Sequence, residues 1–286
     1  MKKITICAIL FCLIFSSACT KKQEDSKKTQ VYTSFYAIYD FAKTICGDYA
    51  DVHNIVPSGT EPHDWEPGTQ DMLAISNADV VFYNGLGMEN WTDKVKTSIE
   101  NPDVKFVELS AEVDTIDNAD PHIWLDPENV IIMCKTISDT MCQADPDNEA
   151  AYKANLAEFT KELTQLNNEF EDSLRNIKTN KLVVSHSAYG YMCSAYGLEQ
   201  CPIEGIGAES EPSPSQMKEI IEYIKNNKIK YIFYEELVSP KIAQTISKET
   251  DTELLPLNPF EGSEQEEDYL TVMRKNLKNI LISLSN

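Results

Sequence analysis

The feature that most constrains the fold of this chain is one uninterrupted amphipathic segment in its middle, residues 149–177. Apolar side chains recur there every three or four positions from Tyr152 to Ile177, and the segment contains neither glycine nor proline. This spacing predicts one long helix. At a rise of about 1.5 Å per residue, the helix would span about 44 Å. Because this is too long for a crossover within one lobe, we expect a rigid strut that joins two lobes.

The stretches on both sides of this segment alternate between strand-like and helix-like patterns. Before it, apolar runs such as residues 79–83 alternate with amphipathic runs such as residues 128–142. After it, Lys181–Ser185 begins a second series, which closes with the amphipathic stretch Glu267–Leu284. This series includes a strand-like run at Pro202–Ile206 and a helix that we expect Ser215 to cap. This alternation is typical of α/β folds with a mostly parallel sheet. The sequence therefore predicts an α/β chain of two parallel-sheet (β/α) lobes joined by one long rigid helix.

The start of the chain has the features of an export signal. Lys2 and Lys3 precede an apolar core, residues 4–15, and Ser16–Cys19 supplies small residues for cleavage. The apolar core is too short to span a bilayer. A signal that ends on a cysteine before a polar stretch favours a bacterial lipoprotein, although Ser16 stands where such signals usually have leucine. A plain secreted protein is the alternative.

We therefore expect an extracytoplasmic protein, anchored to the cell membrane by a lipid on Cys19. The expected division of the chain is a signal peptide over residues 1–19, a polar tether over 20–30, an N-terminal α/β lobe over 31–145, a linking helix over 146–178 and a C-terminal α/β lobe over 179–286.

The net charge and the positions of the cysteines limit the partners and the kinds of metal site that we expect. The net charge is −21, and the first 30 residues are net positive, so the rest of the chain is more acidic still. This charge argues against nucleic acid and anionic lipid surfaces as partners. It suits the attraction of cations, and an ordinary solvated acidic surface is the alternative interpretation. The cysteines after Cys19 are odd in number and form no CxxC pair, so we expect small buried residues and no thiolate zinc site.

Three of the four histidines follow strand-like runs or lie in stiff, proline-flanked stretches. His122 lies in Pro121–Pro127, His63 lies between two prolines in a similar stretch, and His186 follows an apolar run. Ligands of open parallel sheets bind beyond the carboxyl ends of strands, and neutral imidazole is a common metal ligand. Each histidine taken singly is compatible with a packed or surface role. Their common setting favours a metal site, in which Asp126 would orient a ring or an adjacent ligand.

Five motifs occur together and in order along nearly the whole chain that follows the signal. They are PSGTEPHDWEP at Pro57–Pro67, FYNGLGME at Phe82–Glu89, PHIWLDP at Pro121–Pro127, SHSAYGY at Ser185–Tyr191 and YEELVSP at Tyr234–Pro240. In these motifs the chain resembles the metal-binding lipoproteins of bacterial zinc and manganese ABC importers, the cluster A-I solute-binding proteins. The resemblance implies two α/β lobes joined by one long helix, with the metal in the cleft between them.

The resemblance also implies the metal ligands and the cargo. The family's first, second and third ligand positions fall on His63, His122 and His186. Manganese-type members usually have glutamate at the third position, and three imidazoles with one carboxylate favour zinc over manganese. We therefore expect Zn²⁺, with Mn²⁺ as the alternative. His53 has no such match and is expected to be a surface or strand-end residue.

The fourth ligand is expected in the loop after the last strand. Many relatives have an aspartate there, where this chain has Asn258, and a neutral amide is a poor zinc ligand. One subset of zinc-type relatives has a Leu-Asn-Pro-Leu-Glu pattern whose glutamate binds the metal, and Glu261 matches it. A solvated surface acid is the other interpretation of Glu261. The rival carboxylates are Glu235 and Glu236, of which Glu235 is assigned a supporting role.

The resemblance implies a monomeric binding protein that captures Zn²⁺ outside the cell and delivers it to an ABC permease. Two other functions compete with this one. A zinc hydrolase would also use three histidines and an open coordination position. However, the chain has no HExxH motif, and a carboxylate is available as the fourth ligand of the metal. A surface adhesin is the other, and no residue favours or opposes it. We therefore expect a protein that is not an enzyme.

Overall fold

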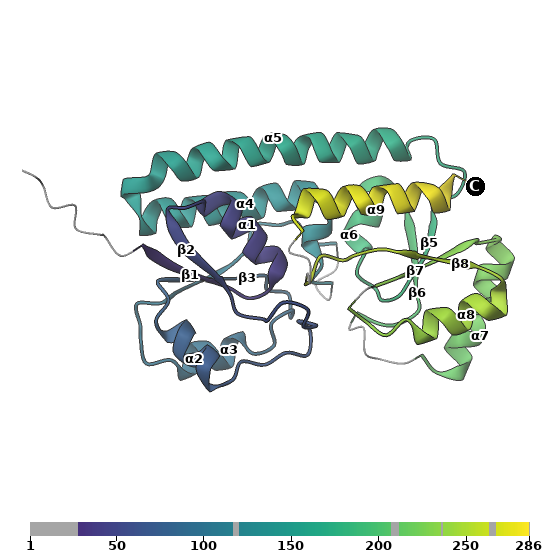
Figure 1. Cartoon of the computed structure of the whole chain (residues 1–286), viewed down its shortest axis with the longest axis horizontal. Helices are drawn as coiled ribbons and strands as arrows, with labels where there is room; N and C mark the ends of the chain where they lie inside the picture. The colour runs from purple at the N-terminus through teal and green to yellow at the C-terminus, as the bar shows by residue number, and fades with distance from the viewer. Residues whose placement is uncertain (1–27, 117–119, 207–211, 236, 263–266, 286) are drawn as a thin grey trace, which may run out of the picture.

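The computed structural model describes residues 28–116, 120–206, 212–235, 237–262 and 267–285. The expected signal peptide, the anchor Cys19, most of the tether and the rival carboxylate Glu236 lie outside the described residues. Among the described helices, none combines the length and the apolar character needed to cross a membrane. Two four-stranded sheets lie side by side, and one long helix runs along both of them (Figure 1).

The N-terminal lobe is built on a parallel sheet with the strand order β2-β1-β3-β4. All four side chains of β3 are buried, as expected for a continuous apolar run inside a parallel sheet. The elements of this lobe are β1 (Thr29–Thr33), α1 (Tyr36–Cys46), β2 (Ala50–Asn54), α2 (Thr69–Ser76), β3 (Val80–Tyr83), α3 (Thr92–Ser98), β4 (Lys105–Glu108) and α4 (Pro127–Ala144).

The C-terminal lobe repeats the same parallel topology, with the strand order β6-β5-β7-β8. In both lobes the first strand therefore lies inside the sheet and the second at its edge. The elements are β5 (Lys181–Val184), α6 (Gly190–Tyr196), β6 (Glu199–Pro202), α7 (Pro214–Asn227), β7 (Tyr231–Tyr234), α8 (Lys241–Thr250), β8 (Glu253–Pro256) and α9 (Tyr269–Leu284).

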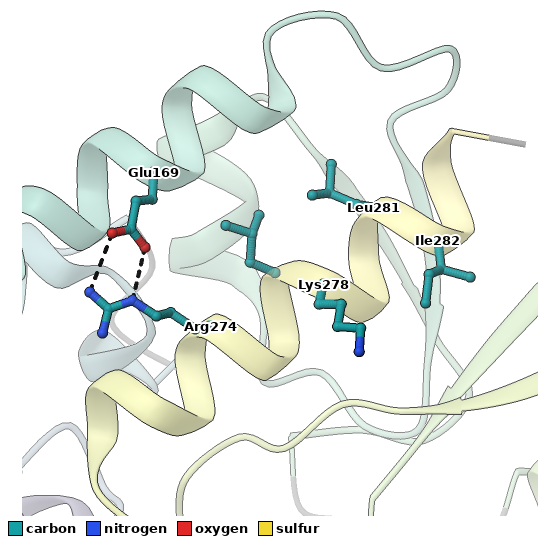
Figure 2. Close-up of a pocket in the computed structure, with 6 residues that line it drawn as sticks. Glu169, Arg274, Lys278, Leu281 and Ile282 are labelled. Carbon is teal, nitrogen blue, oxygen red and sulfur yellow. Dashed lines mark hydrogen bonds and ion pairs between the residues drawn. The ribbon is translucent and has the colours of Figure 1, made fainter.

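Helix α5 (Glu149–Leu174) joins the lobes, which confirms the long helix expected from the spacing of apolar residues. It packs against α1 and α4 of the first lobe and against α6 and α9 of the second. Phe170 of α5 stacks on Tyr196 of α6, with 4.9 Å between ring centroids. On the surface, Glu169 of α5 pairs with Arg274 of α9, with Nε–Oε2 and Nη2–Oε1 distances of 2.9 and 3.3 Å (Figure 2). One helix therefore belongs to the cores of both lobes.

Two local predictions are wrong in their placement. The strand expected near residues 202–206 lies earlier, as β6. Its sequence Glu-Gln-Cys-Pro is polar and contains no apolar run that would reveal a strand. Such a sequence is sufficient for β6, because this strand lies at the edge of the sheet and pairs only with β5. The cap of α7 is Ser213 and not Ser215. The side chain of Ser213 accepts the backbone N–H of Gln216, and the side chain of Gln216 accepts the backbone N–H of Ser213, so the two residues form a capping box. Pro214 occupies the first helical position.

Candidate metal centre

Four side chains named from the sequence converge between the two lobes. His63 lies in the loop after β2, and His122 precedes a short 3₁₀ turn. His186 follows β5, and Glu261 lies in the loop after β8. One nitrogen or oxygen from each of these residues lies within 4.8 Å of all the others. Each lobe therefore contributes two side chains to one group.

The separations within this group have the size of a tetrahedral zinc shell. Nε2 of His122 lies 3.2 Å from Nε2 of His63 and 3.3 Å from Nε2 of His186. Oε1 of Glu261 lies 3.0, 3.4 and 3.6 Å from Nε2 of His122, His186 and His63, respectively. Ligand atoms bound tetrahedrally at about 2.0–2.1 Å stand roughly 3.3–3.4 Å apart. The four atoms therefore fit a zinc ion at their centre.

The environment of Glu261 points to a cation. The residue is 2% exposed, and its Oε1 accepts no hydrogen bond from any residue that the structure describes. A buried carboxylate oxygen without a partner is costly, because its hydration is lost and not replaced. His122 and His186 beside it are fully buried. A cation among these side chains would replace the hydration that the carboxylate has lost.

Two further carboxylates hold the histidine rings in place. Nδ1 of His122 lies 2.8 Å from Oδ1 of Asp120, and Nδ1 of His186 lies 2.8 Å from Oε1 of Glu235. A carboxylate at Nδ1 accepts the ring N–H there and leaves the lone pair of Nε2 for a metal. Glu235 thus has the position of a supporting residue. Asp120 is a second supporting carboxylate, which the sequence did not indicate.

Asp126, which the sequence analysis assigned to the site, has a different role. Its carboxylate accepts the backbone N–H of Glu128 at 2.9 Å and caps α4, with Pro127 at the first helical position. Asp120 is the residue that orients His122. Its Oδ1 also accepts the backbone N–H of His122 at 3.0 Å, so the turn brings the carboxylate and the ring together. The signal in the sequence is an aspartate two residues before the histidine.

Replacing each of these two aspartates with alanine in turn distinguishes their roles. We expect Asp120→Ala to lower zinc affinity by about 10–100-fold, the usual cost of losing a carboxylate that orients a ligand. Asp126→Ala should leave zinc affinity unchanged and lower the free energy of unfolding by about 0.5–2 kcal/mol, the cost of losing a helix cap. Zinc titration and denaturant unfolding of both variants measure these effects. Equal zinc affinities for the two variants would contradict the assignment.

The remaining histidine and the cysteines lie outside this group. His53 is exposed in β2 and stacks on Tyr32, with 4.8 Å between ring centroids. The cysteines in the described part of the chain are free, and none belongs to the metal-binding group. Burial raises the pKa of Cys46 and of Cys193 to about 12, so both thiols stay protonated. A thiolate zinc ligand is therefore disfavoured at these two positions.

The carboxylates around the site raise the proton affinity of two of its histidines when no metal is bound. Burial alone would lower the pKa of His122, but the neighbouring carboxylates of Asp120 and Glu261 outweigh it and raise that pKa. Burial is likewise outweighed at His186, where the charges of Glu261 and Glu235 hold the pKa well above its usual range. Burial would raise the pKa of Glu261, yet His186 and the neighbouring rings hold it well below the usual range. In the metal-free group, both imidazoles therefore hold a proton up to a higher pH than an ordinary histidine does.

Zinc affinity should therefore depend on pH. Zinc binds neutral imidazole, so it must displace the protons that His122 and His186 hold. Because both pKa values are raised, the loss of affinity on acidification should begin above pH 6.5, the usual value for histidine. We expect at least about a tenfold loss per pH unit below the raised pKa values, since each displaced proton contributes one decade. Titrations between about pH 8 and 5 test this, and a constant affinity would contradict it.

The chain is similar over nearly its whole length to known zinc-uptake and zinc-binding proteins. A family model described as "ZnuA: Zinc-uptake complex component A periplasmic" matches residues 31–281. The high-affinity zinc uptake system protein ZnuA of Bacillus subtilis is 32% identical over 305 residues, which cover 96% of each chain. The zinc-binding lipoprotein AdcA of Streptococcus pneumoniae strain R6 is 32% identical over 301 residues, which cover 97% of this chain. They cover 60% of AdcA, so this chain spans about three-fifths of that relative.

A solved structure shows the same fold. The Zn(II)-bound ZnuA-like domain of Streptococcus pneumoniae AdcA has a TM-score of 0.81 and 33% sequence identity with this chain. The match covers 91% of this chain and 100% of that domain. The two-lobe α/β architecture with one long joining helix, expected from the sequence, is thus also the architecture of a zinc-bound protein.

Proposed function

The chain belongs to the ZnuA family of zinc-uptake components, and from this premise we propose that it captures Zn²⁺ outside the cytoplasm and passes it to an ABC permease. The ion is held by His63, His122, His186 and Glu261. The observation that carries this proposal is the buried Oε1 of Glu261, which accepts no hydrogen bond from the described residues and lies within 3.6 Å of three imidazole nitrogens. The zinc-binding names of the relatives support the choice of ion.

The proposed site serves transport and not catalysis. Catalytic zinc sites keep one position open for water or substrate, whereas closed sites use four protein ligands. With Glu261 as the fourth ligand, no position remains for an attacking water. Metal-dependent hydrolysis of ester or phosphoester substrates by the purified chain would contradict this part of the proposal.

We also propose that the protein works as a monomer anchored to the membrane. Cys19 carries the lipid, and residues 20–30 form the tether, which places the metal centre close to the permease. The lipoprotein name of AdcA supports the anchor. The acidic balance of the chain, with a net charge of −21, favours the approach of cations.

Metal titration tests the proposed function. The chain from Thr20 onward should bind one Zn²⁺ per molecule and prefer it to Mn²⁺ by on the order of a hundredfold or more, because manganese favours oxygen ligands and binds imidazole weakly. Elemental analysis gives the stoichiometry, and competition titration gives the preference. Displacement of zinc by manganese at equal concentration would overturn the choice of cargo.

A further inference from the structure

Asp120 lies where the two lobes meet beside a metal-binding histidine. Its Oδ1 faces Nδ1 of His122 at 2.8 Å and accepts the backbone N–H of the same residue at 3.0 Å. The backbone carbonyl of Asp120 accepts a hydrogen bond of 3.3 Å from the hydroxyl of Tyr191, which belongs to α6 in the other lobe. The residue that orients His122 is therefore itself held against the C-terminal lobe.

Gly190, the first residue of α6, leaves room for this carboxylate. A Cβ atom at position 190 would lie 2.3 Å from Oδ2 of Asp120, far inside van der Waals contact. The same Cβ would lie 3.4 Å from Cδ1 of Ile116 and 3.5 Å from Nε2 of Gln200, which are ordinary contacts. Among the nearest neighbours of Gly190, only the carboxylate of Asp120 would have to move.

The backbone does not require glycine at this position. Gly190 is not among the glycines with positive φ, unlike Gly197 at the other end of α6. It lies at the start of a helix, where alanine is the better helix former. Since conformation does not explain the glycine, the space taken by Asp120 is the remaining physical reason for it.

We propose that Gly190 is a positioning residue for the metal centre, whose missing side chain admits the Asp120 carboxylate to His122. The inference rests on the proposed function, since it concerns the site that holds zinc. A methyl group at position 190 would displace the end of the Asp120 side chain, whose Oδ2 it would meet at 2.3 Å. It would also move the acceptor away from Nδ1 of His122, and the ring would lose its fixed orientation. The C-terminal lobe thus sets the geometry of a ligand in the N-terminal lobe.

The substitution Gly190→Ala tests this inference. Zinc affinity should fall by about tenfold, and by no more than in Asp120→Ala, since both weaken the same contact with His122. The melting temperature of the metal-free protein should stay close to that of the wild type, because alanine stabilises the helix and restricts the unfolded chain, which offsets the weakened contacts of Asp120 with His122. A change that lowers affinity without lowering stability separates positioning from a general folding defect.

A double-mutant cycle shows whether the effect passes through Asp120. In an Asp120→Ala background, Gly190→Ala should cause no further loss of zinc affinity, because the oxygen that it displaces is absent. Gly68→Ala is the matched control. Its Cβ would lie 3.5 Å from Oδ2 of Asp71, an ordinary contact, so zinc affinity should equal that of the wild type.

The outcomes are distinct. If the wild type binds zinc and Gly190→Ala binds it equally well, the inference is wrong. It is also wrong if the loss persists without the Asp120 carboxylate, or if affinity and metal-free melting temperature fall together. Failure of the wild type to bind zinc contradicts the proposed function instead.

Discussion

Zinc is expected to raise the melting temperature of this chain by about 8–16 °C, and a chelator to reverse the increase. An ion that binds only the folded state stabilises it by about 4 kcal/mol at a thousandfold excess over the dissociation constant. For a chain of this size, each kcal/mol shifts the melting temperature by roughly 2–4 °C. Because each lobe contributes two of the four side chains, unfolding of either lobe releases the ion.

Scanning calorimetry of the metal-free chain, with and without zinc, measures this effect. Magnesium is the matched control ion, because it prefers octahedral oxygen ligands and should leave the melting temperature unchanged. His186→Ala is the matched variant and should lose most of the zinc-dependent increase. A melting temperature that does not respond to zinc would exclude a tight site in the folded chain.

The parts of the fold that sequence reasoning predicts well are those with a strong hydrophobic period. Helix α5 follows from apolar residues at every third or fourth position, and β3 from an unbroken apolar run. Strand β6 lacks such a run, since an edge strand is satisfied by pairing on one side. Its position depends on β5 beside it, and no local pattern in the sequence records that neighbour.

The residues of the site also differ in how well the sequence predicts them. The three histidines stand out because they follow strands or lie in stiff stretches, and Glu261 follows from a family resemblance. Asp120 does not stand out, because it ends an acidic loop in which one more carboxylate is unremarkable in sequence terms. Asp126 stands four residues after the histidine and is predicted to support it, yet Asp-Pro-Glu is also a typical helix start, and capping α4 is its role here. Gly190 is explained only by the position of a side chain from the other lobe.

The second large effect is expected at Glu261, whose carboxylate completes the proposed ligand set. A zinc site worth about 10–16 kcal/mol over four ligands loses roughly a quarter of that with one ligand, which corresponds to about two to three decades in affinity. Glu261→Ala should therefore weaken zinc binding by on the order of a hundredfold to a thousandfold. The fold should tolerate the change, because the carboxylates of Asp120 and Glu235 still pair with the rings of His122 and His186.

Asn258 provides the matched comparison within the same loop. Its Oδ1 accepts the backbone N–H of Phe260 at 2.7 Å, and its own backbone N–H donates to Oδ1 of Asn276 at 2.9 Å. The amide thus braces the loop in which Phe260 adopts a φ of 61°, a conformation that is rare for a residue other than glycine. Asn258→Ala should cost about 1 kcal/mol of stability and change zinc affinity by less than about tenfold.

Zinc titration of Glu261→Ala and Asn258→Ala beside the wild type is the most direct measurement of the proposed ligand set. A large loss of zinc affinity in Glu261→Ala, with affinity close to that of the wild type in Asn258→Ala, is the expected result. An unchanged affinity in Glu261→Ala together with a large loss in Asn258→Ala would show that the fourth ligand has been assigned to the wrong residue.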